Sequence, residues 1–594
     1  MTTLEAPTNS LEPTLAESNQ EKNVKRKPGE AWKKDEVHEL PYNNMWLVFP
    51  GLILTTFLAA LDQTIVSTAL PTIVSELGGA SGYSWVGTSY LLTSAACAPI
   101  YGVLSDMFGR KPTLFFAIIV FLLGSALCGS AKSFIWLCVA RGVQGIGGGG
   151  ALQLCQITVS DITRLEDRGK FVGLLGATWG IASLLGPLLG GILSDHATWR
   201  WIFYINLPTG GFAIALLAAF LNLNPKPRKT WRAHAAEFDF LGLILAIGGV
   251  VCVLLGFNFS EDSWSDAKTI GLLVAGIVLF ILCAINEAVI TTRRPIFPPR
   301  MFKTVTTAGL LLSAFVQSIS FTGASYYLPN YFQVLGSTAT LSGVRLIPFS
   351  LVASITAILG GQIVSRTGKY RPTIWTSWVF MTFTFGILYL LDYDTSVAVQ
   401  VILTLVAAIG VGPLFPVPLI ALQAAMPLKD MATSTSTMAV LRFLGGTIGI
   451  SVGQAVYESG LRARLPAIQG YNPEQSGMTN DLRGLVNIEP ESVRNDVLHA
   501  YTRSLALIWI VYCGCNFIGL LLVLPIRSYS LKRQVVQHGE KGGAVTPPSP
   551  EKTADLEQGI TQKTDDAGSS KDSGEEKQVT ARVDTLIAAE EQAK

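Results

Sequence analysis

The sequence predicts an all-α membrane protein that contains a duplicated helical bundle. Its 594 residues are 49% hydrophobic and only 14% charged, with a mean hydropathy of +0.42, which is too apolar for a soluble protein of this size. Long apolar runs recur along the chain, each long enough to cross about 30 Å of hydrocarbon as a helix. A loop between two of these runs, Gly102–Pro112, has a degraded copy at Gly361–Pro372.

The apolar runs give the predicted helices in order. We count fourteen, near residues 46–69, 83–104, 113–130, 134–159, 171–193, 201–221, 238–259, 270–290, 307–331, 343–364, 373–391, 395–425, 434–457 and 504–526. The repeated loop joins runs two and three and then runs ten and eleven, whereas two six-helix halves alone would repeat after six runs. Two extra helices, 238–259 and 270–290, therefore separate the halves, and the predicted arrangement is six plus two plus six.

The chain divides into five predicted segments. Residues 45–221 form the first six-helix bundle, residues 222–304 a linker with the two extra transmembrane helices, and residues 305–527 the second bundle with an extracellular loop at 458–503. The terminal segments 1–44 and 528–594 carry 15 Lys/Arg and 20 Asp/Glu with little apolar content, so we expect disordered cytoplasmic tails.

The distribution of basic residues predicts the orientation in the membrane. Even-numbered loops hold Lys and Arg repeatedly, whereas the short odd-numbered loops show only Lys132, Arg200 and Lys268. Because cytoplasmic loops are enriched in Lys and Arg, both termini are predicted to be cytoplasmic.

Charged residues inside the apolar runs are few, and each is a candidate functional residue because burying it in lipid costs at least about 2.5 kcal/mol. Asp62 in the first run and Arg141 in the fourth are predicted to lie at similar depth. A carboxylate that exchanges a proton beside a permanently charged guanidinium suits proton coupling. A fixed structural ion pair is the alternative. For Arg442, substrate or counter-charge recognition and simple packing both stay open, and Glu287 is expected to extend to the membrane interface.

The fifth run contains Gly186, Pro187, Gly190 and Gly191. The glycines remove side chains from the helix surface, so a neighbouring backbone can approach closely. Pro187 removes a backbone donor and favours a bend. This segment suits a helix that moves against a neighbour, although ordinary small-residue packing also explains part of it.

Five sequence motifs, each in the expected apolar run or loop, resemble those of the fourteen-span drug/proton antiporter branch of the major facilitator superfamily. The resemblance covers residues 46 to about 526 and rests on Leu61–Pro71, Gly102–Lys111, Arg141–Gly150, Gly180–Gly191 and Trp199–Pro208. It implies parallel repeated halves that alternate around a substrate site near the bilayer midplane. It also implies that Gly186, Pro187, Gly190 and Gly191 form the motif associated with exporters.

The resemblance assigns a gating role to the repeated loop. Gly102, Asp106, Gly109, Arg110 and Lys111 match the family's cytoplasmic loop, whose charges latch the two halves together in the outward-facing state. The alternative is that these charges serve topology alone. In the second copy Ser365 replaces the aspartate, which makes a second latch doubtful.

Several residues are candidates to line a substrate cavity. They are Gln144, Trp179, Phe321, Tyr326, Tyr327 and Arg442. Aromatic rings can hold planar or cationic compounds, but Tyr and Trp also gather at membrane interfaces.

The resemblance implies a proton-coupled exporter of small hydrophobic molecules. Similar proteins with acidic tails include fungal multidrug and secondary-metabolite toxin efflux pumps, which implies the plasma membrane. A vacuolar basic amino acid exchanger, a siderophore exporter and a membrane sensor with a transporter-like body are the alternatives. The expected partners are a small-molecule substrate, protons and the lipid bilayer, with no nucleic acid, and we expect a monomer. No enzymatic constellation, metal site or cofactor is expected, and the proton gradient is the expected energy source.

Overall fold

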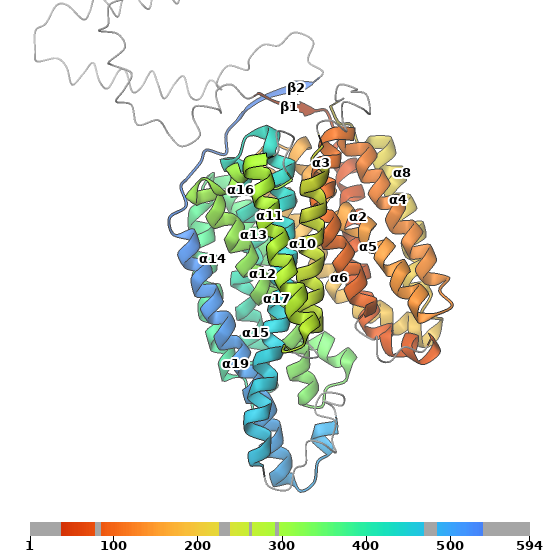
Figure 1. Ribbon diagram of the computed structural model, residues 1–594, viewed down its shortest axis with the longest axis vertical. Helices are drawn as coiled ribbons and strands as arrows, with labels where there is room; N and C mark the ends of the chain where they lie inside the picture. Colours follow the sequence, from red (N-terminus) through yellow and green to blue (C-terminus); the bar gives the residue numbers. More distant parts are fainter. Residues whose placement is uncertain are drawn as a thin grey trace, which may run out of the picture. The chain divides into compact units, whose positions relative to one another are not determined.

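Helices make up almost all of the computed structural model, which describes residues 37–77, 85–224, 238–260, 264–290, 296–468 and 484–538 (Figure 1). Thirteen helices of this described part are long and apolar enough to cross a membrane. The chain is therefore a multi-pass integral membrane protein. Most of both predicted tails, residues 1–36 and 539–594, lies outside the described residues.

The first predicted bundle consists of seven helices. They are α2 (Met45–Leu77), α3 (Trp85–Phe108), α4 (Arg110–Gly129), α5 (Phe134–Ile162), α6 (Arg168–His196), α7 (Trp201–Tyr204) and α8 (Asn206–Phe220). The sixth apolar run is interrupted at Ile205, between α7 and α8. Helix α5 is 29 residues long but is not among the thirteen apolar helices, because it is rich in glycine and carries Arg141.

Two helices follow where the extra pair was predicted, α10 (Phe240–Phe259) and α11 (Ala267–Ile285), and they pack against each other. A π-helical turn, Asn286–Ile290, continues α11. The expectation for Glu287 is wrong, because its side chain is buried and accepts hydrogen bonds from the backbone N–H groups of Ile296 (2.8 Å) and Phe297 (2.9 Å). Glu287 thus holds the segment that follows α11, satisfying donors that have no helical partner.

The second predicted bundle also consists of seven long helices. They are α12 (Val305–Val334), α13 (Ala339–Thr367), α14 (Arg371–Ile387), α15 (Val397–Val411), α16 (Pro416–Ala425), α17 (Met431–Arg464) and α19 (Glu491–Val523). The apolar run 395–425 is divided into α15 and α16 by a 3₁₀ turn, Gly412–Leu414. Pro413, Pro416 and Pro418 explain this break, since each removes a backbone donor from the helix.

Much of the predicted loop 458–503 is helical. Helix α17 continues to Arg464, and α19 begins at Glu491. Ion pairs one helical turn apart support these polar extensions, with Arg462 Nη2 3.3 Å from Glu458 Oε2 and Arg494 Nη2 2.7 Å from Glu491 Oε1. The prediction of a loop is therefore wrong for the two ends of this segment, which are helical. Residues 469–483 lie outside the described residues.

Two short strands flank the helices in the chain. Strand β1 (Val37–Pro41) pairs in parallel with β2 (Gln534–His538), as Figure 1 shows. Next to β1, Asn43 and the backbone of Asn222 exchange two hydrogen bonds of 2.8 Å, which fix the start of the chain to the end of α8. The interpretation of 1–44 and 528–594 as wholly disordered is therefore wrong for these two strands, whose pairing joins distant parts of the sequence.

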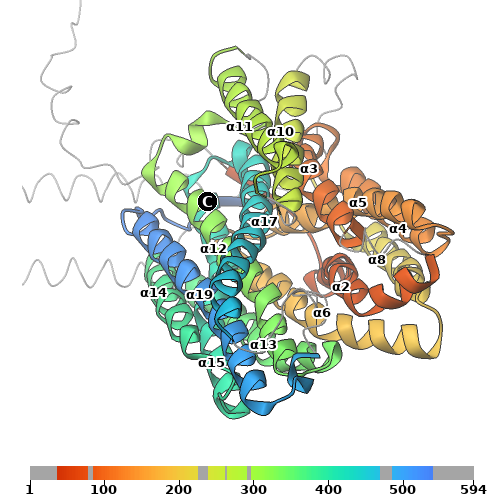
Figure 2. The same cartoon turned by 60° about the horizontal axis from the view of Figure 1, so that its bottom comes forward.

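The two predicted halves contact each other most extensively along two helix pairs, α6 with α13 and α3 with α17 (Figure 2). In the first pair the backbones touch at Gly169 and Gly361. A Cβ atom built on either glycine would overlap the backbone carbonyl of the other. Only glycine at both positions permits this approach.

We expect Gly361→Ala to destabilise the protein, because the added methyl group must push α13 away from α6. Overpacking of this kind costs about 1–3 kcal/mol. Thermal unfolding of the purified protein in nanodiscs measures the effect. The matched control is Gly271→Ala in α11, where an added Cβ has open space around it. Equal melting temperatures for the two variants would contradict the proposed backbone contact.

Candidate functional site

The first half encloses an ion pair that is shielded from solvent. Arg141 of α5 donates through Nη1 to Asp62 Oδ2 of α2, and both side chains are buried. The structure thus brings together the two charges that the sequence placed at similar depth. Breaking one member of such a pair is costly, typically about 3–5 kcal/mol, because the other charge stays buried and unpaired.

Two side-chain amides complete the hydrogen bonds of Asp62. Gln144 Nε2 donates to Asp62 Oδ1 at 2.7 Å, and Asn206 Nδ2 of α8 donates to the same oxygen at 3.2 Å. Arg141 also donates to Gln144 Oε1 at 2.8 Å, so the three side chains form a closed network. Because Arg141, Gln144 and Asn206 all donate to it, Asp62 accepts on both oxygens, which is the pattern of an ionised carboxylate.

Neighbouring helices fix the orientation of this network. Ser125 Oγ of α4 accepts from Gln144 (2.8 Å) and from Asn206 (3.2 Å). On the other side, Arg141 Nε donates to the carbonyl of Val86 in α3 at 3.0 Å. The guanidinium carbon lies 4.5 Å from the centre of the Tyr90 ring, a cation–π distance. Five helices therefore contribute to one polar site, which we call the Asp62 cluster.

Sequence reasoning found part of this cluster. Gln144 was predicted to line a substrate cavity, but the structure places it, fully buried, between Asp62 and Arg141. Asn206 and Ser125 were not predicted as site residues. Asn206 lay within a recognised motif, Trp199–Pro208, and a buried amide in an apolar helix was the signal that could have found it.

The predicted exporter motif packs beside the Asp62 cluster. A Cβ atom on Gly186 of α6 would overlap Thr64 Oγ1, and this hydroxyl donates across the helix pair to the carbonyl of Ala182 at 3.1 Å. Thr64 is two residues after Asp62 in α2. Gly190 is buried, whereas a Cβ on Gly191 would have open space. The side chain of Pro187 lies outside the described residues.

The predicted gating loop is almost entirely helical. Gly109, with a φ of 97°, is the single residue between α3 and α4, and its positive φ favours glycine. Arg110 bridges Asp106 and Asp161 of α5, both at 2.7 Å. Lys111 donates to the carbonyls of Ala218 (3.0 Å) and Leu221 (2.7 Å) at the end of α8. Arg110 and Lys111 thus bind groups of the first half, and their role in latching the two halves in the outward-facing state stays a prediction.

Contacts between the halves involve Gly102 of this loop and several residues near it. A Cβ on Gly102 would overlap Ser436 Oγ of α17, and Gln153 of α5 donates to the same oxygen at 3.0 Å. Arg168, fully buried at the start of α6, donates to Gln423 Oε1 of α16 at 3.0 Å. None of Gln153, Arg168 or Gln423 was predicted, because polar residues at the ends of apolar runs give no sequence signal of their partner.

The aromatic cavity candidates occupy different environments. Tyr327 is buried, and its hydroxyl donates to the carbonyl of Ile450 at 2.6 Å, so it has a packing role, whereas Tyr326 is 48% exposed. Trp179 is partly buried against apolar residues of the first half. Phe321 packs edge-on against Phe415, with 4.8 Å between ring centres. These four aromatic candidates therefore differ in their exposure and in the residues against which they pack.

Comparisons with known proteins identify the family. The sequence matches the Major Facilitator Superfamily over residues 52–450. The chain belongs to this superfamily. It is 38% identical to an uncharacterised MFS-type transporter of Schizosaccharomyces pombe over 84% of this chain and 85% of the relative. It is 36% identical to the efflux pump dotC of Dothistroma septosporum, covering 81% and 83%, and 33% identical to the efflux pump FUS6 of Gibberella fujikuroi, covering 82% and 90%.

Solved structures show the same superfamily fold. The human organic anion transporter MFSD10 matches with a TM-score of 0.56 at 15% identity, over 81% of this chain and all of that one. The proton:xylose symporter XylE matches with a TM-score of 0.53 at 14% identity, over 83% and 98%. These matches establish the all-helical transporter fold, and the superfamily is one of transporters and not of enzymes.

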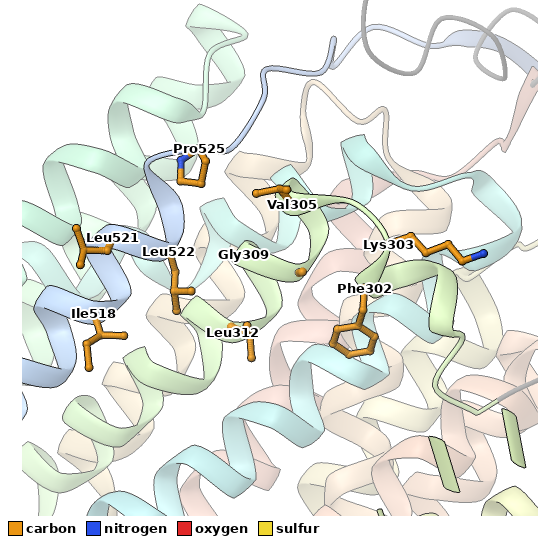
Figure 3. Close-up of a pocket in the computed structure, with 10 residues that line it drawn as sticks. Phe302, Lys303, Val305, Gly309, Leu312, Ile518, Leu521, Leu522 and Pro525 are labelled. Carbon is orange, nitrogen blue, oxygen red and sulfur yellow. The ribbon is translucent and has the colours of Figure 1, made fainter. Parts of the chain in front are cut away.

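An open groove lies on this superfamily fold at one end of α12 and α19 (Figure 3). Its volume is about 430 Å³, and its lining is apolar except for Lys303. Val305, Gly309 and Leu312 of α12 face Ile518 and Leu521 of α19 across it. It contains none of the predicted site residues and lies apart from the Asp62 cluster.

We expect Gln144→Leu to destabilise the transporter. Leucine cannot donate to Asp62 and Ser125 or accept from Arg141, and each buried polar group left unsatisfied costs about 1–3 kcal/mol. The melting temperature in nanodiscs measures the loss. Gln454→Leu is the matched control, because Gln454 pairs with Glu458, whose partly exposed carboxylate can turn to water instead. A Gln144→Leu protein as stable as this control would argue against the network.

Proposed function

We propose that this protein is a proton-coupled efflux transporter, an antiporter that exports small hydrophobic or amphipathic compounds such as toxins, secondary metabolites or drugs. The buried pair of Asp62 and Arg141 carries this proposal, because charged side chains are costly to bury in a membrane helix bundle and therefore usually mark a functional site. Relatives that are named efflux pumps and align over most of the chain support the direction of transport.

Asp62 couples proton movement to the conformational change in this mechanism. While ionised, it is held by Arg141, Gln144 and Asn206, which joins α2 to α5 and α8. Protonation removes the negative charge and adds a donor that faces three donors, so the network must rearrange. Because α2 also contacts Gly186 of α6 through Thr64, a shift of α2 is passed to a helix that contacts the second half.

The proposed topology is fourteen spans arranged as six, two and six. Helix α5 supplies the span that apolarity alone does not identify, since its length of 29 residues is sufficient and its Arg141 and Gln144 side chains are hydrogen-bonded inside the bundle. With both termini in the cytoplasm, the contacts made by Gly102, Arg168 and Gly361 lie on the cytoplasmic side. The halves then meet there, as in an outward-facing state. We place the transporter in the plasma membrane as a monomer.

A pH difference should drive uphill export. One proton exchanged across a difference of one pH unit supplies about 1.4 kcal/mol, which sustains at most an about tenfold cargo gradient. The purified protein is reconstituted into liposomes, a fluorescent hydrophobic dye is added, and the membrane potential is clamped to zero. We expect dye to accumulate against its gradient when the pH difference is imposed and to equilibrate when a protonophore is added. Accumulation that ignores the protonophore would refute proton coupling.

The Asp62→Asn variant should lose uphill transport, because asparagine cannot exchange a proton. It should still allow dye to move down its gradient if it inserts and folds, which gel filtration checks. Asp392→Asn is the matched control, because Asp392 is another buried carboxylate, paired with Arg503 at 3.0 Å outside the Asp62 cluster. The same dye assay compares the two variants, and an Asp62→Asn protein that pumps as well as the control leaves Asp62 without a coupling role.

A further inference from the structure

Arg442 is an intramembrane arginine whose charge no carboxylate of the described residues neutralises. It lies in α17, eleven residues after Met431, which is about 16 Å along the helix and near the middle of a bilayer of about 30 Å. Its hydrogen bonds run from Nη2 to the carbonyls of Leu414 (3.1 Å) and Phe415 (2.9 Å). Arg141 has Asp62 as its counter-charge, whereas Arg442 is held only by dipoles.

The broken helix explains why the Leu414 carbonyl is available. In a continuous helix the carbonyl of Leu414 would accept from the N–H of residue 418, but Pro418 has no N–H. Arg442 Nη2 supplies the missing donor to this carbonyl. Its Nε is buried without a hydrogen-bond partner among the described residues, and its Nη1 makes no hydrogen bond to them either. Since a guanidinium carries five N–H donors, part of the Arg442 fork is still available to a ligand.

One aromatic ring, that of Phe415, lies over this arginine and begins a row of rings that continues into α12 and α13. The guanidinium carbon lies 5.4 Å from the centre of the Phe415 ring. Phe415 packs edge-on against Phe321 of α12, and Phe321 is stacked at 6.3 Å with Phe349 of α13. Arg442, Phe415 and Phe321 are each only partly buried, so some of their surface is accessible. Rings arranged in this way favour contact with a further flat ring.

A second unpaired polar group lies one helical turn from one of these aromatic residues, Phe321. Gln317 precedes Phe321 by one helical turn in α12 and is buried, and neither its Nε2 nor its Oε1 has a partner among the described residues. Helix α17 packs against α12 of its own half and against α3 and α5 of the other half. The arginine is therefore carried by a helix at the contact between the halves, where transporters with parallel repeats bind their cargo.

We propose that Arg442 recognises an oxygen anion on the cargo, so that exported compounds include flat aromatic molecules that carry a carboxylate or an ionised phenol. This inference rests on the proposed export function and specifies its substrate class. The planar guanidinium fork matches two oxygens of a carboxylate, and the phenylalanine rings receive the aromatic part. A cationic cargo is disfavoured at this position, because Arg442 repels it and Asp62 is already engaged by Arg141.

A binding experiment on the full chain in nanodiscs tests this assignment without requiring transport. The probes are 1-pyrenebutyrate and its neutral amide, which share one aromatic system and differ in charge, and their affinities are measured by fluorescence titration. We expect the acid to bind about tenfold to a hundredfold more tightly than the amide. In Arg442→Gln this preference should disappear, because the acid loses its charged partner while the amide does not.

The matched control is Arg371→Gln. Arg371 also lies over an aromatic ring, 4.5 Å from the centre of Trp375, and its Nε also lacks a partner among the described residues, but it is at the start of α14 away from the broken helix. The acid preference should persist in this control. In Arg442→Lys the acid preference should be reduced but still present, because lysine keeps the positive charge and loses the planar guanidinium group. This variant replaces Arg442→Gln in the test if Arg442→Gln does not fold.

Three outcomes would overturn the inference. They are equal affinity of the wild type for acid and amide, including no binding of either, an unchanged preference in Arg442→Gln, and equal affinities in a folded Arg442→Lys protein. If the acid and the amide bind equally well and the dye is still exported in response to a pH difference, the proposed substrate class is wrong and the proposed export function is supported. If the protein prefers the acid but its transport never responds to a pH gradient, the anion site is supported and proton-coupled export is contradicted.

Discussion

The cost of keeping a carboxylate and a guanidinium in a hydrophobic bundle constrains the whole first half. Asp62 and Arg141 can remain charged there only while their donors and acceptors are matched. The matching groups come from α3, α4 and α8 as well as from α2 and α5. These helices must therefore assemble together, since the absence of any one leaves a buried polar atom without its partner.

Close backbone contacts connect this polar site to the rest of the molecule. Gly186 lets α6 approach α2 next to Asp62, and Gly169, nearer the start of α6, lets the same helix touch Gly361 of α13. Helix α6 thus contacts both α2, the helix that carries Asp62, and the opposite half. This continuity is a physical route by which a local change at Asp62 can bias the contact between halves, and coupling measurements decide whether it is used.

Sequence patterns predicted the helices well and their polar contacts poorly. Apolar runs located the long helices, because span length and hydropathy are local properties. Asp62 and Arg141 were found because charge is rare in such runs, whereas Asn206 and Gln423 were missed because an amide acquires its role only from a helix far along the chain. Glu287 was misassigned for the same reason, since its partners are backbone N–H groups after the next turn.

The parallel pairing of β1 with β2 has a consequence for biosynthesis. Strand β1 precedes the first helix and β2 follows the last one, so the partner of Val37 is made only after every membrane helix has been synthesised. During translation the early helices enter the bilayer while β1 has no strand to pair with. The ribbon can therefore form only after all of the described helices have been synthesised, and its presence distinguishes such a chain from one that still lacks its last helix.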